Sequence, residues 1–142
     1  MRGACEDSVA IELQTTNQPA RILNHGEKLP FNQTITKTPY GICYDETTGG
    51  IWITICGYYY VSWNISLGGS TDVKEISFSF INSFNKDSIT TSIPVALTNQ
   101  ISGNALLKVC QMNQRYFLIN SSGGRVQLAN TGTQANLVMF RI

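Results

Sequence analysis

The residues of this sequence best suited to chemistry are its single histidine, its four cysteines and a few carboxylates. Nucleophilic catalysis needs a positioned base, and His25 would have to supply it. His25 lies in the turn-like stretch Asn24-His25-Gly26-Glu27, so we expect it at the surface. Asp45 and Glu46 are adjacent, whereas glycoside hydrolysis needs two carboxyl groups across a cleft, so turn polarity explains this pair better. We therefore expect no enzymatic activity and no cofactor.

The cysteines and carboxylates do not match a metal-binding motif. No Cys-x-x-Cys pair occurs, and with one histidine the spacing fits no zinc site. Calcium prefers several oxygen ligands, and candidate oxygens lie on Asp7, Asp45, Glu46 and Asp72. No Asp-x-Asp loop gathers them, so the sequence predicts no metal site and leaves calcium as the open alternative.

Cys43 and Cys56 flank the Gly49-Gly50 turn symmetrically. A two-residue loop would place them opposite each other and allow a cross-strand disulfide, whereas a four-residue loop over residues 46–49 would shift the pairing and separate them. Both registers stay open. The alternative is that the cysteines have no such partner, with Cys43 and Cys110 as small buried residues and Cys5 free or paired between chains.

Short β-strands are the elements expected to position these side chains. Thr48-Gly49-Gly50 is a turn signal between two runs rich in β-branched and aromatic residues, which predicts a hairpin. Residues 58–67 then alternate, and one set is predicted to face a core: Tyr59, Val61, Trp63, Ile65 and Leu67. The other set is polar apart from Tyr58 and Tyr60. About ten short strands at 8–12-residue spacing, without a convincing helix, predict an antiparallel sandwich or barrel.

Three later strands carry further expectations. Residues 75–84 should direct Ile76, Phe78 and Phe80 to the core, with Ser77 and Ser79 on the other face. Residues 89–97 include Pro94, which predicts an edge strand or a bulge. Residues 137–142 are apolar on both faces, with Leu137 and Met139 on one and Val138, Phe140 and Ile142 on the other. A sandwich strand normally exposes one face to solvent. We therefore expect a subunit interface on the outer face of residues 137–142, with a covering loop as the alternative.

The composition limits the class of protein. The 142 residues fit one domain, which we place at residues 8–142 after an N-terminal tail at residues 1–7. Charged residues make up only 13% and the net charge is +1, without a basic cluster, so we expect no nucleic-acid partner. No run of about 18 apolar residues occurs, so we expect no membrane insertion.

The hairpin region resembles a known family. The order Tyr-Asp-x-x-Thr-Gly, an apolar strand, and Gly-x-Tyr-Tyr-Val resembles the globular head of complement's q subcomponent, within the TNF-like jelly-roll superfamily. The matching positions are Tyr44, Asp45, Thr48, Gly49, Gly57, Tyr59, Tyr60 and Val61. The resemblance covers about residues 8–142, although Cys56 stands where the family has a proline.

The resemblance implies an all-β, ten-stranded antiparallel jelly-roll sandwich that forms a homotrimer. The Ser-, Thr- and Asn-rich sequence is most similar to the C-terminal domains of bacterial collagen-like surface proteins, including exosporium glycoproteins of the spore surface. This implies an extracellular, cell-surface or spore-surface location. It also implies a Gly-x-y stalk before residue 1, and no such repeat occurs in these residues.

Two functional hypotheses follow. In the first, the domain is a structural head whose trimer interface is formed by Tyr58, Tyr60, Val138, Phe140 and Ile142. In the second, it is a lectin-like or receptor-binding module that engages a glycan or a protein through outer loops containing Gly69, Asp72, Ser122 and Thr131. Trp52 is the better candidate for stacking on a sugar, since Trp63 is predicted to lie in the core.

Overall fold

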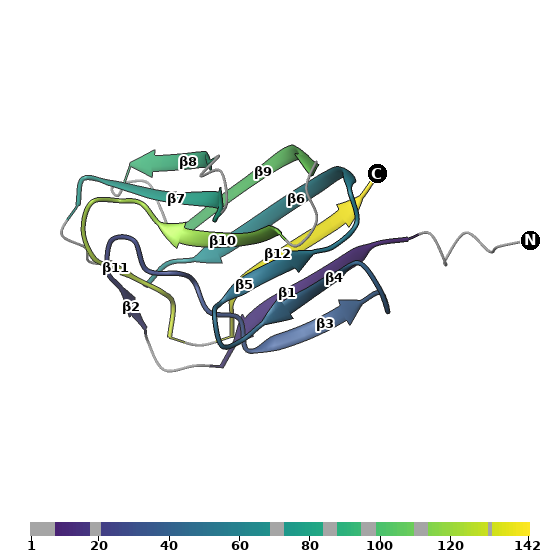
Figure 1. The fold of residues 1–142 in the computed structure, drawn as a ribbon. Helices are drawn as coiled ribbons and strands as arrows, with labels where there is room; N and C mark the ends of the chain where they lie inside the picture. Colours follow the sequence, from purple (N-terminus) through teal and green to yellow (C-terminus); the bar gives the residue numbers. More distant parts are fainter. Residues whose placement is uncertain are drawn as a thin grey trace, which may run out of the picture.

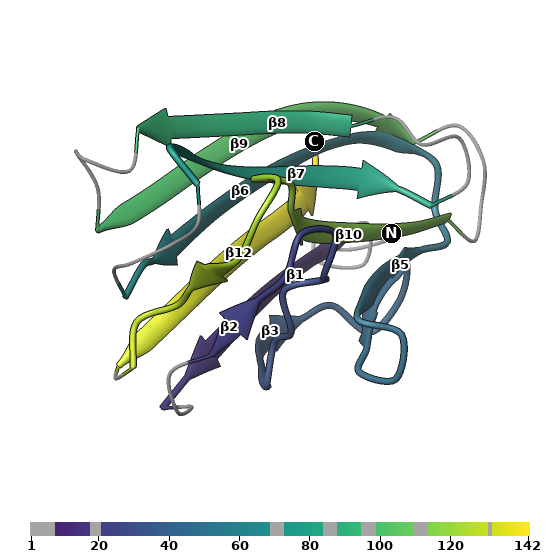
Figure 2. The ribbon, with the colours of Figure 1, turned by 90° about the vertical axis from the view of Figure 1, so that its left-hand side faces the viewer.

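The computed structural model describes residues 8–17, 21–68, 73–83, 88–94, 99–109, 114–130 and 132–142. Within these residues the chain forms twelve β-strands and no helix. Ten of the strands form two five-stranded antiparallel sheets that face each other (Figures 1 and 2). The predicted ten-stranded sandwich is therefore confirmed, with one short two-stranded ladder added.

The first sheet holds the two strands nearest the chain ends, and we call it the terminal sheet. Its strand order is β3 (Gln33–Lys37), β1 (Ala10–Thr16), β12 (Thr133–Arg141), β6 (Gly57–Ser66) and β9 (Gln100–Val109). The second, the hairpin sheet, has the order β4 (Ile42–Asp45), β5 (Gly50–Ile53), β10 (Gln114–Asn120), β7 (Glu75–Asn82) and β8 (Ser88–Pro94). The short ladder pairs β2 (Ile22–Leu23) with β11 (Val126–Gln127).

The chain passes repeatedly between the two sheets, as a jelly roll requires. After β4 and β5 in the hairpin sheet, β6 returns to the terminal sheet, β7 and β8 cross again, and β9 crosses back. β8 is an edge strand and ends at Pro94, which confirms the expectation for that proline.

The core lies between the sheets and combines many aliphatic side chains with a stack of aromatic rings. Alternate residues from Tyr59 to Leu67 were predicted to face inward, and all five are buried: Tyr59, Val61, Trp63, Ile65 and Leu67. Phe80 of β7 stacks between Trp63 and Tyr116, with ring centroids 5.7 and 5.4 Å apart. This continuous stack removes a large apolar area from water and joins the sheets.

A four-residue loop determines the register of the β4–β5 hairpin. Asp45 pairs with Gly50, and residues 46–49 form the turn, in which Gly49 has a φ of +75°. That positive φ favours glycine because a side chain would be strained there. The register places Cys43 opposite Trp52 and not near Cys56.

The Cys43–Cys56 disulfide, which the sequence left open as one of two alternatives, is consequently absent. Both cysteines are free and exposed. The expectation that Cys43 is a buried apolar residue was also wrong, because its neighbour Ile42 takes the inward position of β4. Cys5 and Cys110 lie outside the described residues.

Candidate interaction face of the terminal sheet

The outer face of the terminal sheet carries an exposed apolar patch. Phe140 of β12 pairs with Ala10 of β1 on one side and Tyr60 of β6 on the other, and Tyr60 pairs with Leu106 of β9. These side chains therefore form one row across the sheet. The rings of Tyr60 and Phe140 meet with their centroids 5.6 Å apart.

The patch continues at the end of the strands. The Ile142 N–H donates to the Tyr58 carbonyl at 2.8 Å, which places the last residue beside the first outward side chain of β6. Tyr58 pairs with Lys108, whose ammonium lies 6.0 Å from the centre of the tyrosine ring. The exposed fractions are large for apolar side chains: Tyr58 53%, Leu106 64%, Phe140 39% and Ile142 72%. We define the apolar patch as Tyr58, Tyr60, Leu106, Phe140 and Ile142.

All five residues predicted for the trimer interface share this face. Val138 lies in the next row, between Glu12 and Ser62. Their role in an interface stays a prediction, since the structure holds one chain. Leu106 also lies on this face and was not predicted. Two adjacent leucines in a strand point to opposite faces, and Leu107 is the one packed against the core.

Among the residues named for the predicted ligand loops, only Ser122 is described. Its hydroxyl accepts the Ser77 N–H at 2.8 Å and donates to the Ser77 carbonyl at 3.1 Å. Its own N–H donates to Asn120 Oδ1 at 2.9 Å. Ser122 therefore holds its loop on β7. Gly69, Asp72 and Thr131 lie outside the described residues.

The same loop covers the outer face of β7. Ser77 and Ser79 are both buried, and each lies within hydrogen-bonding distance of the Ser121 hydroxyl, at 3.0 and 2.8 Å. Buried hydroxyls need partners, and this network supplies them. The outer face of β7 is therefore covered by its own chain at Ser77 and Ser79, while Glu75 on the same face is exposed.

The two tryptophans occupy different environments. Trp63 lies in the core, as predicted. Trp52 is half-buried on the outer face of the hairpin sheet, and the Arg115 guanidinium lies 4.3 Å from the centre of its ring. This cation–π contact covers ring surface that a stacked sugar would use.

His25 is at the surface, as predicted, and forms a structural contact. Its Nδ1 accepts the Gly123 N–H at 2.9 Å, which joins the turn at residues 24–27 to the loop at residues 121–124. Asn120 reinforces this junction, since its buried side-chain amide donates to the carbonyls of Leu23 and Gly124, both at 2.9 Å. The hydrogen bond to Gly123 therefore gives His25 a structural role in joining the two loops.

Two tyrosine hydroxyls are also structural. Tyr59 donates to the Ile55 carbonyl at 2.7 Å, and Tyr44 accepts the Phe31 N–H at 3.0 Å. Burial raises the pKa of both hydroxyls above the ordinary tyrosine value, so both stay neutral at physiological pH.

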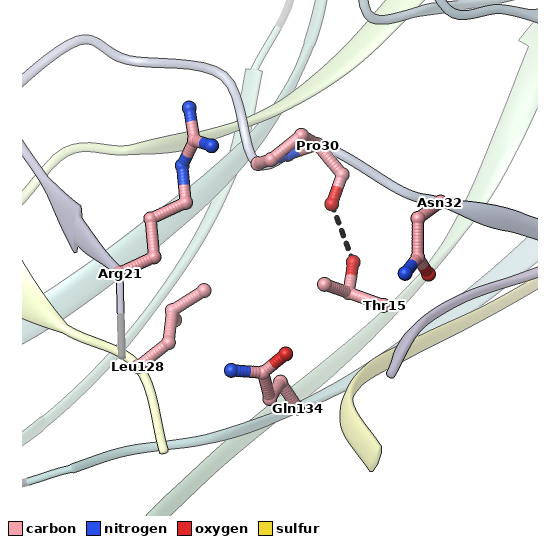
Figure 3. Close-up of a pocket in the computed structure, with 6 residues that line it drawn as sticks. All are labelled: Thr15, Arg21, Pro30, Asn32, Leu128 and Gln134. Carbon is pink, nitrogen blue, oxygen red and sulfur yellow. Dashed lines mark hydrogen bonds between the residues drawn. The ribbon is translucent and has the colours of Figure 1, made fainter. Parts of the chain in front are cut away.

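A small pocket lies where β1 ends and β12 begins (Figure 3). Its volume is about 90 Å³, and six residues line it: Thr15, Arg21, Pro30, Asn32, Leu128 and Gln134. The buried Thr15 hydroxyl donates to the Pro30 carbonyl, and the buried Gln134 amide donates to the Ala129 carbonyl. Both side chains therefore attach neighbouring segments to the sandwich by hydrogen bonds. Arg21 is the cationic residue among those that line the pocket.

Other kinds of site find no support in the described part of the chain. It contains no group of three or more His, Cys, Asp or Glu side chains that could hold a metal ion. In these same residues, no helix is long and apolar enough to cross a membrane.

Comparisons with known proteins identify the fold. No family model and no curated protein matches the sequence. Eiger TNF from S. frugiperda is similar in structure, with a TM-score of 0.74 at 11% identity over 95% of this chain and 92% of that one. The globular domain of zebrafish complement 1qA gives a TM-score of 0.65 at 13% identity, over 94% of this chain and 95% of that one. Murine APRIL at pH 5.0 gives 0.67 at 10% identity, over 96% and 100%.

These similarities show the fold. The chain has the TNF-like, complement-head-like jelly-roll fold that the sequence resemblance implied. At such low identity the likeness shows the fold alone. The link to bacterial collagen-like proteins rests on the sequence resemblance and is taken up as a proposal.

Proposed function

We propose that this domain is a homotrimeric globular head that ends a longer extracellular protein. The observation that carries the proposal is the apolar patch on the terminal sheet. Contiguous exposed apolar surface usually marks a contact with another molecule. A second copy of the same chain could cover this apolar surface without a further partner. The trimeric state is the one implied by the resemblance.

The mechanism is association rather than chemistry. Each copy would bury Tyr58, Tyr60, Phe140 and Ile142 against its neighbours, and removing this area from water would stabilise the assembly. In the full protein the three heads would bring three stalk chains together and set their register. The collagen-like stalk and the cell or spore surface are part of this proposal and rest on the sequence resemblance.

The adhesive alternative is compatible with a trimer but has less support. The one described residue of its loops, Ser122, uses its hydroxyl and N–H in intramolecular bonds. One face of the Trp52 ring packs against the Arg115 guanidinium. Binding of a glycan or a protein by the outer loops therefore remains secondary to assembly in this proposal.

The test is light scattering coupled to size exclusion. We expect a mass of about three times the 15.7 kDa protomer for the wild type, as a closed trimer requires. Phe140→Asp should give a monomer or an insoluble protein, because it would place a charge inside the interface. The matched control is Ser83→Asp, which adds the same charge at an exposed turn beside the hairpin sheet and should stay trimeric. A soluble, fully trimeric Phe140→Asp protein would contradict the proposed interface.

A further inference from the structure

The β6–β9 ladder of the terminal sheet keeps one register over its whole length. Ten residue pairs follow one another without a bulge, and the last of them joins Gly57 to Val109. A cysteine comes next on both strands at this end, because Cys56 precedes Gly57 and Cys110 follows Val109. We propose that Cys56 and Cys110 form a reversible cross-strand disulfide that closes this end of the ladder under oxidising conditions.

The register of the described residues sets the distance that such a bond must span. In an antiparallel ladder the Cα atoms of paired residues lie about 4.5–5.5 Å apart, and Gly57 and Val109 are such a pair. One further step of the same register makes the two cysteines direct partners. A disulfide joins Cα atoms about 4.4–6.8 Å apart, so the bond requires no rearrangement of the sheet. Cys110 lies outside the described residues, and its pairing is the inferred step.

The thiol of Cys56 is accessible to an oxidant. Cys56 is exposed and free, so the structure represents the reduced state. Two residues further along the chain, Tyr58 is exposed on the outer face of the sheet and pairs with Lys108 of β9. Side chains alternate between the faces of a strand, and paired residues share a face. The continued ladder would therefore direct both thiols to the same outer face as Tyr58 and Lys108.

The fold and the unfolded chain favour different partners for Cys56. In the fold, Cys43 lies opposite Trp52 in the hairpin sheet, whereas Cys56 lies directly before β6 of the terminal sheet. In the unfolded chain, Cys43 is the nearest cysteine in sequence, and closing a shorter loop costs less entropy. The partner that Cys56 takes on oxidation therefore reports whether the β6–β9 register selects it.

The bond forms by thiol–disulfide exchange with a small disulfide such as oxidised glutathione. The Cys56 thiol releases its proton, its thiolate attacks one sulfur of the reagent, and a glutathione thiolate leaves. The Cys110 thiolate then attacks the Cys56 sulfur of the mixed disulfide, and the second glutathione thiolate leaves. Two protein thiols are oxidised, and one disulfide is reduced to two thiols that take up the protons. In the oxidising setting proposed for the domain, the bond would fasten the edge strand β9 to β6.

The test counts thiols after the fully reduced, folded protein has been treated with one equivalent of oxidised glutathione. Remaining thiols are alkylated in denaturant, and intact mass distinguishes them from glutathione adducts. We expect the wild type to lose two of its four thiols without gaining glutathione. Digestion without reduction should yield a peptide that links Cys56 to Cys110. Cys43→Ser is the matched control and should lose the same two thiols, whereas Cys56→Ser and Cys110→Ser should form no such link.

Oxidation in concentrated denaturant is the control for the register. There the main linked peptide should join Cys43 to Cys56, as loop closure favours. A native protein in which Cys56 pairs with Cys43 or Cys5, or keeps glutathione without transferring it to Cys110, would overturn the proposal. The same Cys56–Cys110 peptide as the main product in denaturant would also overturn it, because the fold would then not select the pair. The proposed trimer is measured separately by light scattering and stands or falls independently of these outcomes.

Discussion

Trp63 and Gly103 lie opposite each other in the β6–β9 ladder, and the indole occupies the space where a side chain at position 103 would begin. A Cβ on Gly103 would lie 2.4 Å from Cζ2 of Trp63 and 2.6 Å from Cγ2 of Thr91. Trp63 and Thr91 belong to facing sheets, so this glycine lets the sandwich close tightly between β8 and β9. The same closeness allows the indole to stack on Phe80.

Gly103→Ala should therefore destabilise the fold. The added methyl would force the indole and β8 apart, at a cost of about 1–3 kcal/mol in the free energy of unfolding. Denaturant titration followed by tryptophan fluorescence measures this change. Ser102→Ala, on the same strand but facing outward, is the control and should lie within about 0.5 kcal/mol of the wild type. If Gly103→Ala were as stable as that control, Trp63 and Thr91 would have to move aside at little cost, which would contradict the prediction.

Thr91→Val should keep or increase stability. Thr91 Oγ1 is buried without a hydrogen-bond partner, as is the neighbouring Trp63 Nε1. Replacing the hydroxyl with a methyl group of similar size removes a desolvation cost of about 1 kcal/mol. Thr90→Val is the matched control and should lose stability, because the Thr90 hydroxyl lies 2.6 Å from that of Ser79. Calorimetric melting of the two variants separates these effects, and a clearly destabilised Thr91→Val protein would indicate that its hydroxyl has a partner in solution.

The β4–β5 turn should make stability depend on pH in the acid range. Asp45 accepts hydrogen bonds from the Thr48 hydroxyl and the Thr47 N–H, both at 3.0 Å, and the Thr48 bond is the main reason that the Asp45 pKa is lowered. A carboxyl with a lowered folded-state pKa stabilises the fold above its unfolded pKa, and this contribution disappears as the pH falls through the folded pKa.

The measurement is the thermal midpoint of the wild type and Asp45→Ala. The wild type should melt at a higher temperature at about pH 6, and the gap should shrink as the pH falls below the unfolded-state aspartate pKa of about 3.9 and through the lowered folded-state pKa of Asp45. Asp45→Asn keeps an acceptor for the Thr47 N–H without the charge, so its difference from Asp45→Ala should not vary with pH. A gap between wild type and Asp45→Ala that is constant over this range would contradict the assigned role of the carboxylate.

The thiols of Cys43 and Cys56 should react with a maleimide in the folded protein. Both are free and exposed, and the register holds them apart. Cys43→Ser and Cys56→Ser should each reduce labelling of the native protein by about one equivalent. Peptide mapping without reduction provides the complementary measurement, since a peptide that links Cys43 to Cys56 would require a different hairpin register.

The sequence by itself determined the strands and their inward faces. Alternation in residues 58–67 identified the buried set, because a side-chain period of two leaves only one choice of face once Trp63 is placed inside. The apolar residues on both faces of 137–142 likewise showed that Phe140 and Ile142 would be left outside a single sandwich.

Only the tertiary structure decided which residues meet across strands. The turn length set Cys43 against Trp52, and small changes in a loop are enough to shift a ladder. Leu106 joined the apolar patch because β9 pairs with β6, an adjacency between strands about forty residues apart that no local pattern encodes. Ser77 and Ser79 became buried because a loop distant in sequence covers their strand. Local periodicity therefore specifies what each strand buries, while long-range pairing specifies what each face presents to a partner.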